Sequence, residues 1–421
     1  ESCGGAMFFY NTSNNNNFTG YFINNSALGK IDATNGNGEA ITFKDISSNS
    51  VFTCDFINNT AILYGGGVNY RQTPHNITFN SNFINNNAKY GGGVNFFESF
   101  DNVVFNGEFD GNSAEYGGAV AFKQGVIENV SFKNNHAEFG GAICAYDKLN
   151  VSGSTFYNNS ASQRGGAIYI EGQVSDCIIN STFVGNSAYQ GGAIFFNNET
   201  DNNLIAGYFE GNSAERIGGA LCFQAKSCDN VISAEFYNNT ARAASGGAIF
   251  FRNIAEGNQF ESVFRSNRAV YGAGIFFYNK ANNNRFLSDF SSNVANSSGG
   301  AMVFHNTTNN NYFSGSFVSN SALGEKLGDV WNGNGGAITF SDVSSNCLFD
   351  CEFINNTAAL NGGGMHYWKT TNNITFNSNF TNNDATYGGA IYFAADGTVI
   401  NSNFTNNTAV EGGAICSDGN L

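Results

Sequence analysis

The sequence predicts an all-β protein that folds as a parallel β-helix of about 15 to 16 coils, because it combines a short repeat with a recurring glycine motif. The pattern F-x-x-N-x-A occurs fifteen times, with most copies 23 to 28 residues apart. A glycine doublet followed by apolar residues separates successive copies, as in Gly165-Gly166-Ala167-Ile168. A fixed period of this length is typical of solenoid proteins. The fifteen copies begin at Phe22, Phe56, Phe83, Phe109, Phe132, Phe156, Phe183, Phe209, Phe236, Phe264, Phe290, Phe317, Phe353, Phe380 and Phe404.

The composition supports a folded chain and excludes two classes of partner. The 421 residues include 42 Phe, and 41% are hydrophobic, so apolar side chains suffice for a core. The formal net charge of −15 argues against a nucleic-acid partner, since there is no excess of Lys and Arg to contact phosphates. The chain contains no apolar run of about 18 residues or more. We therefore expect no direct membrane insertion in this segment.

Each repeat Phe lies in a predicted strand with one buried face. In Phe52, Cys54 and Phe56, large, small and large side chains alternate with more polar residues, which is the period of a strand. A second strand with the same alternation follows each glycine doublet, as at Ile194 and Phe196. A repeat of about 26 residues is too short for a propeller blade of about 40 residues. The spacing therefore favours the β-helix.

Asn and Gly are predicted to form the turns and columns of the β-helix. An Asn stands three residues after each repeat Phe, for example Asn59 and Asn86. Its amide can donate to one neighbouring coil and accept from the other, and we expect the same Asn to adopt the left-handed backbone of a sharp turn. Gly is expected at the other turn, where a Cβ atom would clash or φ must be positive.

A longer period suggests tandem duplication. Residues 4–97 resemble residues 299–393, and both segments contain an insertion, at residues 28–38 and 323–335. We predict one continuous β-helix over residues 1–421, as a segment of a longer array. Neither end has an obvious cap, so we expect that the natural chain continues or that another copy covers an end.

The paired motifs resemble those of a known group of surface proteins. The glycine doublet and F-x-x-N are similar to the repeats of chlamydial polymorphic outer-membrane proteins and of adhesin-like proteins of methanogenic archaea. The resemblance covers the whole chain, and the Asn content favours the archaeal group. It implies a right-handed parallel β-helix that is displayed outside the cell and serves adhesion.

No catalytic or metal-binding constellation stands out. The four His residues lie in unrelated coils, although His305 and His366 both follow glycine doublets. Some β-helices are polysaccharide lyases or hydrolases, which need carboxylates gathered on neighbouring coils. Here the acidic residues are scattered, so we expect no enzyme, no cofactor and no metal site. A polysaccharide-processing β-helix enzyme is the alternative.

An aromatic stripe is the candidate contact surface. The position after the first apolar residue of the glycine strand should point outwards, yet it is often aromatic. An exposed stripe would serve lateral packing or stacking on sugar rings. The alternative is that a loop covers the stripe or that the two faces are reversed. The candidate residues are Phe8, Tyr169, Phe195, Phe250, Phe276 and Tyr392.

Two kinds of covalent modification are predicted. Six N-x-S/T sequons recur two residues after a repeat Phe, at Asn24, Asn58, Asn158, Asn238, Asn355 and Asn406, which makes them glycosylation candidates. Most of the nine Cys residues are expected to be small buried side chains. Cys222 and Cys228 are candidates for a disulfide within one loop.

The sequence therefore predicts a non-enzymatic extracellular protein of the cell surface. It would be an adhesin-like stalk or filament component, attaching cells to cells or surfaces through repeated outer faces. The expected partners are another copy of the chain, joined end to end or laterally, or a glycan or protein on another cell.

Overall fold

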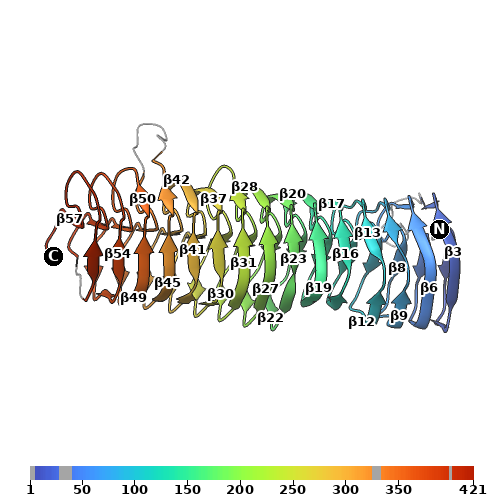
Figure 1. The fold of residues 1–421 in the computed structure, drawn as a ribbon. Coiled ribbons are helices and arrows are strands. Elements are labelled where there is room, and N and C mark those ends of the chain that lie inside the picture. The colour runs from blue at the N-terminus through green and yellow to red at the C-terminus, as the bar shows by residue number, and fades with distance from the viewer. Residues whose placement is uncertain (1–4, 28–39, 325–332, 398–400) are drawn as a thin grey trace. The chain divides into compact units, whose positions relative to one another are not determined.

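The computed structural model describes residues 5–27, 40–324, 333–397 and 401–421. The chain forms two compact units, unit 1 (residues 1–198) and unit 2 (residues 199–421). Within each unit the described residues form strands and turns, and none is helical, so none forms a helix able to span a bilayer. The prediction of an all-β protein is confirmed. Figure 1 shows the coils, with unit 1 in blue to green and unit 2 continuing to red.

The strand after each glycine doublet belongs to a parallel sheet, which we call sheet A. Among the described residues, each unit contains eight of these strands, one per coil, which agrees with the expected number of coils. In unit 1 they are β1 (Met7–Phe9), β5 (Ile41–Phe43), β8 (Val68–Tyr70), β11 (Val94–Phe96), β14 (Val120–Phe122), β18 (Ile143–Ala145), β21 (Ile168–Ile170) and β25 (Ile194–Phe196). In unit 2 they are β29 (Leu221–Phe223), β33 (Ile249–Phe251), β38 (Ile275–Phe277), β43 (Met302–Phe304), β47 (Ile338–Phe340), β51 (Met365–Tyr367), β55 (Ile391–Phe393) and β57 (Ile415–Ser417).

The strands that carry the repeat Phe residues form a second parallel sheet, sheet B. In unit 1 it contains β2 (Ser13–Asn14), β3 (Asn17–Ile23), β6 (Ser47–Ile57), β9 (His75–Phe79), β10 (Phe83–Ile84), β12 (Asp101–Phe105), β13 (Glu108–Asp110), β15 (Gly125–Glu128), β16 (Ser131–Lys133), β19 (Leu149–Tyr157) and β23 (Ile178–Val184). In unit 2 it contains β27 (Leu204–Glu210), β31 (Val231–Tyr237), β35 (Gln259–Phe260), β36 (Val263–Arg265), β40 (Arg285–Leu287), β41 (Asp289–Ser291), β45 (Tyr312–Val318), β49 (Leu348–Ile354), β53 (Thr375–Phe376), β54 (Asn379–Thr381) and β56 (Asn403–Thr405).

Short strands complete the coils. After the repeat Phe, unit 1 has β4 (Ser26–Ala27), β7 (Thr60–Ala61), β17 (His136–Phe139), β20 (Ser160–Arg164) and β24 (Ser187–Gln190). The corresponding strands of unit 2 are β28 (Ser213–Ile217), β32 (Thr240–Ala241), β37 (Arg268–Tyr271), β42 (Val294–Ser298), β46 (Ser321–Ala322) and β50 (Thr357–Ala358). Between sheets A and B lie β22 (Val174–Ser175) in unit 1 and, in unit 2, β26 (Thr200–Asp201), β30 (Ser227–Cys228), β34 (Ala255–Glu256), β39 (Ala281–Asn282), β44 (Thr308–Asn309), β48 (Ser344–Ser345) and β52 (Thr371–Asn372).

The predicted inward face of sheet B is the core. Phe52, Cys54 and Phe56 are buried in β6, while the residues between them are more exposed. Like residues lie over one another, so their rings stack, and the centroids of Phe56 and Phe83 are 4.8 Å apart with an interplanar angle of 2°. Each buried Phe contributes roughly 1.5–3 kcal/mol. The core is therefore a set of Phe columns, as predicted.

The Asn three residues after the repeat Phe forms the expected ladder. The Nδ2 of Asn59 donates to the carbonyl O of Phe22 at 2.8 Å and to Oδ1 of Asn86 at 2.9 Å. Its own Oδ1 accepts from the backbone N–H and the side-chain amide of Asn25. Both hydrogens and both lone pairs of the amide are used, which is what a buried Asn requires.

One detail of the turn differs from the prediction. The left-handed residue is the one before the ladder Asn, for example Asn58 with φ 54° and Asn238 with φ 54°. The ladder Asn is not among the residues with positive φ. The two roles separate because a left-handed residue turns its side chain outwards, whereas the ladder amide must point inwards to reach the neighbouring coils.

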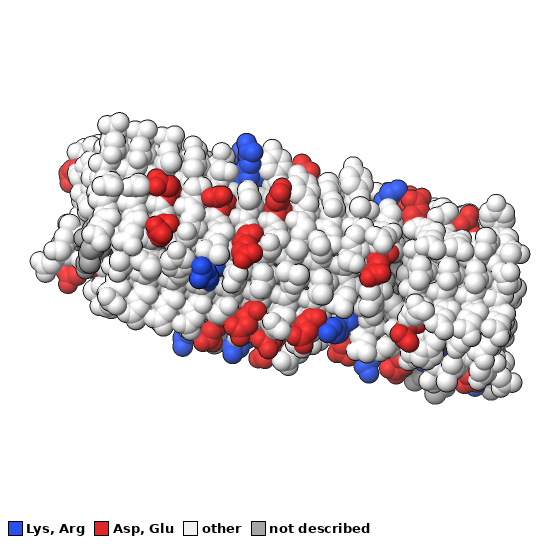
Figure 2. All heavy atoms as spheres, turned by 60° about the horizontal axis from the view of Figure 1, so that its bottom comes forward, with Lys and Arg blue, Asp and Glu red and all other residues white. Residues whose placement is uncertain are grey.

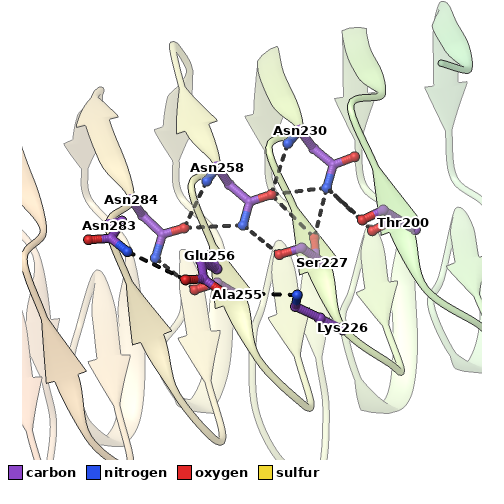
Figure 3. A network of polar contacts seen from close by, with 9 residues as sticks. All are labelled: Thr200, Lys226, Ser227, Asn230, Ala255, Glu256, Asn258, Asn283 and Asn284. Carbon is purple, nitrogen blue, oxygen red and sulfur yellow. Dashed lines mark hydrogen bonds and ion pairs between the residues drawn. The ribbon is translucent and has the colours of Figure 1, made fainter. Parts of the chain in front are cut away.

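A second inward ladder in unit 2 was not predicted. Asn230, Asn258 and Asn284 stand six residues before a repeat Phe, and Figure 3 shows their amides in one row. Nδ2 of Asn230 donates to Oδ1 of Asn258 at 3.0 Å, and Nδ2 of Asn258 donates to Oδ1 of Asn284 at 3.1 Å. The recurrence of Asn at this position, from Asn203 to Asn311, is the sequence signal. This recurrence is hard to recognise because Asn is frequent throughout the sequence.

The two insertions of the longer period fall mainly on residues 28–39 and 325–332, which lie outside the described residues. The tandem duplication and the continuity of the chain as one β-helix stay predictions.

Candidate binding site on the outer face of sheet A

The six aromatic residues of the predicted stripe lie on the outer face of sheet A, but most are not exposed. Tyr169, Phe195, Phe250 and Phe276 are buried, and Phe8 and Tyr392 are half-buried. The expectation of an exposed stripe is therefore wrong for the four buried residues, and the alternative that other residues cover the stripe is correct for them. Their role in binding or self-association stays a prediction, and Phe8 and Tyr392 are the most accessible of the six.

At Tyr169 and Phe195 the cover comes from residues on either side of the strands of sheet A. The guanidinium group of Arg164, just before a glycine doublet, lies 5.0 Å from the centroid of the Phe195 ring. The same group donates to Oδ1 of Asn197, just after β25, at 2.9 Å. The hydroxyl of Tyr169 likewise bonds the carboxylate of Glu171. These side chains bridge the face of the sheet and exclude water from the rings beneath.

In unit 2 the cover is incomplete and leaves a cavity of about 380 Å³. Its floor consists of Phe276, Val303 and Thr339, which are neighbours in register on β38, β43 and β47. One wall comes from residues that precede glycine doublets. The opposite wall comes from residues that directly follow strands of sheet A. The wall residues are Ser245, Tyr271, Ser298 and Asn334 on the first side, and Tyr278, His305, Ser341 and Trp368 on the second.

The second wall presents aromatic rings to solvent. Tyr278 is 49% exposed and Trp368 is 46% exposed. The imidazole of His305 stacks on the ring of Tyr278, with centroids 5.2 Å apart and an interplanar angle of 16°. None of the lining residues is Asp, Glu, Lys or Arg. The cavity therefore combines flat apolar surfaces with hydroxyl and amide groups, as small-molecule sites commonly do.

The sequence prediction found the floor of this cavity through Phe276 but missed the exposed wall. The missed signal is an aromatic or imidazole side chain immediately after a strand of sheet A, at Tyr278, His305 and Trp368. The signal is hard to recognise in the sequence because residues of the adjacent strands are often aromatic as well.

His366 lies in β51, next to the cavity floor. It is the register partner of Thr339 and is fully buried. The edge of the Trp368 ring covers it at a centroid distance of 4.7 Å, and Tyr392 stacks on its other side at 5.5 Å. Burial lowers the pKa of His366 to about 3, so its ring is neutral at pH 7.

The six predicted glycosylation sites share one position. Asn24, Asn58, Asn158, Asn238, Asn355 and Asn406 are exposed, have positive φ and precede a ladder Asn. Their side chains are accessible, whereas the middle residue of each sequon is held in the ladder. Glycosylation stays a prediction.

The predicted disulfide is wrong. Cys228 carries a free thiol, so it does not bridge to Cys222. Cys222 lies in the middle of β29 in sheet A, whereas Cys228 ends β30, which belongs to a different sheet.

Charged side chains of the described residues form ion pairs rather than a metal-binding group. In the parts of the chain that the structure describes, no three His, Cys, Asp or Glu side chains are grouped so as to hold a metal ion. Figure 2 shows Asp and Glu side chains dispersed among uncharged residues on the face in view. Several acidic groups pair with Lys instead, for example Glu108 with Lys133 at 2.7 Å.

Four segments of the chain match the Chlamydia polymorphic membrane protein repeat, namely residues 129–146, 153–171, 233–252 and 401–418. Each segment spans one repeat Phe and the glycine doublet that follows it. The chain thus contains repeats of the polymorphic outer-membrane protein type, and together with the β-helix they are consistent with a surface protein. The closer resemblance to methanogen proteins stays a prediction. No curated protein and no solved structure matches the chain.

Proposed function

We propose that the protein is a non-enzymatic, adhesin-like protein of the cell surface that attaches by binding neutral carbohydrate in the cavity of unit 2. The observation that carries this proposal is the exposed row of Tyr278, His305 and Trp368 above a floor of Phe276, Val303 and Thr339. Aromatic faces can pack against the apolar faces of sugar rings, while nearby hydroxyl and amide groups can bond sugar hydroxyls.

The chemistry of the cavity favours binding over cleavage. Glycosidases require a pair of carboxyl groups on either side of the scissile bond. The described residues that line the cavity include no carboxyl group, and its lack of charge suits a neutral glycan rather than an acidic one. Attachment to another cell or surface follows if such glycans are displayed there.

The proposal is tested with an array of immobilised neutral oligosaccharides. We expect the wild-type protein to bind at least one of them. Tyr278→Ala and His305→Ala should each weaken that binding by about tenfold, because each removes roughly 1–2 kcal/mol of stacking. Tyr157→Ala, which alters a 49% exposed ring in unit 1, is the matched control and should bind normally. Failure of the wild type to bind any neutral glycan would contradict the proposal.

We further propose that the protein self-associates into filaments, is glycosylated and is of archaeal origin. Sedimentation velocity over a range of concentrations checks the first, and intact-mass measurement of the native protein checks the second.

A further inference from the structure

His366 is a fully buried polar side chain next to the floor of the cavity. Among the described residues, neither its Nδ1 nor its Nε2 has a hydrogen-bond partner, although the ring is fully buried. A buried polar group without a partner costs about 1–3 kcal/mol. Such groups in a folded protein call for an explanation, and one explanation is a ligand that supplies the partner.

The covering side chain belongs to the cavity. Trp368 lines the cavity wall and its ring rests edge-on against His366, yet Trp368 itself is 46% exposed. Thr339, the register partner of His366, is part of the floor. Its hydroxyl donates to the carbonyl O of Asn334 at 2.7 Å. A rotation of the Trp368 side chain towards solvent would extend the floor from Thr339 onto His366 without any change in the backbone.

Unit 1 also has a buried polar side chain at the position that the longer sequence period makes equivalent to His366. Asn69 stands 297 residues before His366 and is fully buried on the outer face of sheet A, beside Thr42. Among the described residues, Nδ2 of Asn69 and Oγ1 of Thr42 have no partner, while Oδ1 of Asn69 accepts from Nδ2 of Asn95 at 2.9 Å. A buried polar atom without a partner on this face is therefore not peculiar to His366.

We propose that His366 is a covered subsite of the cavity, and that Trp368 moves aside so that the imidazole bonds a hydroxyl of a neutral sugar. This inference rests on the proposed function and specifies which protein group forms a hydrogen bond with a hydroxyl group of the sugar. The neutral imidazole offers one donor and one acceptor, which matches a hydroxyl group. Trp368 then packs against the same sugar from the side, so the energy of uncovering His366 is offset by new contacts.

Calorimetric titration with mannotriose, cellotriose and chitotriose tests the subsite. His366→Phe fills the space without a polar atom and should weaken binding of the sugar that the wild type binds by about tenfold, the effect of one lost hydrogen bond. His366→Asn, which copies Asn69 of unit 1, should restore most of the affinity. His366→Phe should melt no lower than the wild type, since it keeps a ring against Trp368 and Tyr392 and breaks no existing hydrogen bond.

The outcomes separate the two proposals. If the wild type binds a sugar, Tyr278→Ala weakens this binding and His366→Phe leaves it unchanged, the subsite is overturned and the proposed function stands. Absence of binding for all three trisaccharides and on the glycan array would overturn both.

Chemical labelling tests the cover independently of any sugar. Diethyl pyrocarbonate modifies accessible neutral imidazole, and peptide mapping reports each His separately. We expect His366 to be protected in the wild type and to react at least about tenfold faster in Trp368→Ala, while His75, in unit 1, keeps its rate in both. Protection of His366 that persists in Trp368→Ala would show that Trp368 is not the cover and would overturn the proposal.

Discussion

At the scale of single residues, the ladder Asn explains how a chain so rich in amides can have a dry interior. Asn112 accepts from the backbone N–H and from Nδ2 of Asn86, each at 3.0 Å. It donates to the carbonyl O of Phe83 at 2.7 Å and to Oδ1 of Asn135 at 3.0 Å. Each amide thus provides hydrogen-bond partners for its neighbours and receives partners from them. The free-energy cost of burying one ladder Asn therefore depends on the presence of the next.

We predict that Asn112→Ala destabilises the protein by about 2–5 kcal/mol, because it leaves the backbone N–H and one amide hydrogen of Asn86 buried without their acceptor. Urea unfolding followed by circular dichroism measures the change. The matched control is Asn106→Ala. The Nδ2 of Asn106 also bonds an Asn of the next coil, Asn80 at 2.9 Å, but this bond is exposed to water. The control should cost less than about 0.5 kcal/mol. Equal losses would show that the ladder contributes nothing beyond its surface counterpart.

At the scale of elements, the glycine doublet sets the distance between coils. The first Gly of the pair has positive φ, for example 64° at Gly218, which turns the chain into sheet A. The second Gly has no room for a side chain. A Cβ atom at Gly219 would lie against the carbonyl O of Gly247 and within 2.7 Å of the backbone of Thr240. The doublet therefore has two separate causes, conformation and close approach of neighbouring coils.

Gly219→Ala should destabilise the protein by about 3 kcal/mol or more, since backbone atoms on two sides would have to move apart. Gly211→Asn is the control. Gly211 has φ 60° with open space around its Cβ position, and Asn238 occupies the equivalent place in the next coil with φ 54°. Asn tolerates this backbone, so the control should change stability by less than about 0.5 kcal/mol. Differential scanning calorimetry compares the two. If Gly219→Ala melts at the same temperature as the control, the close approach of neighbouring coils is not the reason for the second Gly.

The sequence predicts those features of the structure that are determined within one repeat, and fails for features that depend on side chains from several coils. The alternation around Phe52, Cys54 and Phe56 identifies the buried face, because inward positions depend on hydrophobicity alone. The burial of Phe195 does not follow from its own coil, since Arg164 covers it through a bond to Asn197. The cavity arises where such a cover is lacking, and that depends on side chains from several coils. Columns are therefore predictable from the repeat, whereas a site built on exceptions to the repeat is not.

At the scale of the whole molecule, the described residues of each unit are stabilised by ring stacking and Asn ladders, and several of their cysteines are free. Neighbouring coils interact through parallel strands, Phe columns and Asn ladders, and such contacts add up approximately coil by coil. Cys54, Cys144, Cys347 and Cys351 are buried free thiols, and Cys54 and Cys351 occupy the small inward position two residues before a repeat Phe. They act as packing groups, so the redox state of the surroundings should matter little to the fold.

Dithiothreitol should therefore leave the melting temperature unchanged, and native alkylation should separate the thiols by burial. Burial raises the pKa of Cys54 to about 11 and also raises the pKa values of Cys144 and Cys351, so little thiolate exists at pH 8. We expect iodoacetamide to leave these three unmodified in the native protein and to modify them fully in urea. The half-buried Cys416 provides the internal comparison and should react first. Mass spectrometry of the digested protein reads each site. A melting temperature that falls on reduction would reveal a covalent link on which the fold depends, and it would contradict a structure stabilised by stacking from coil to coil.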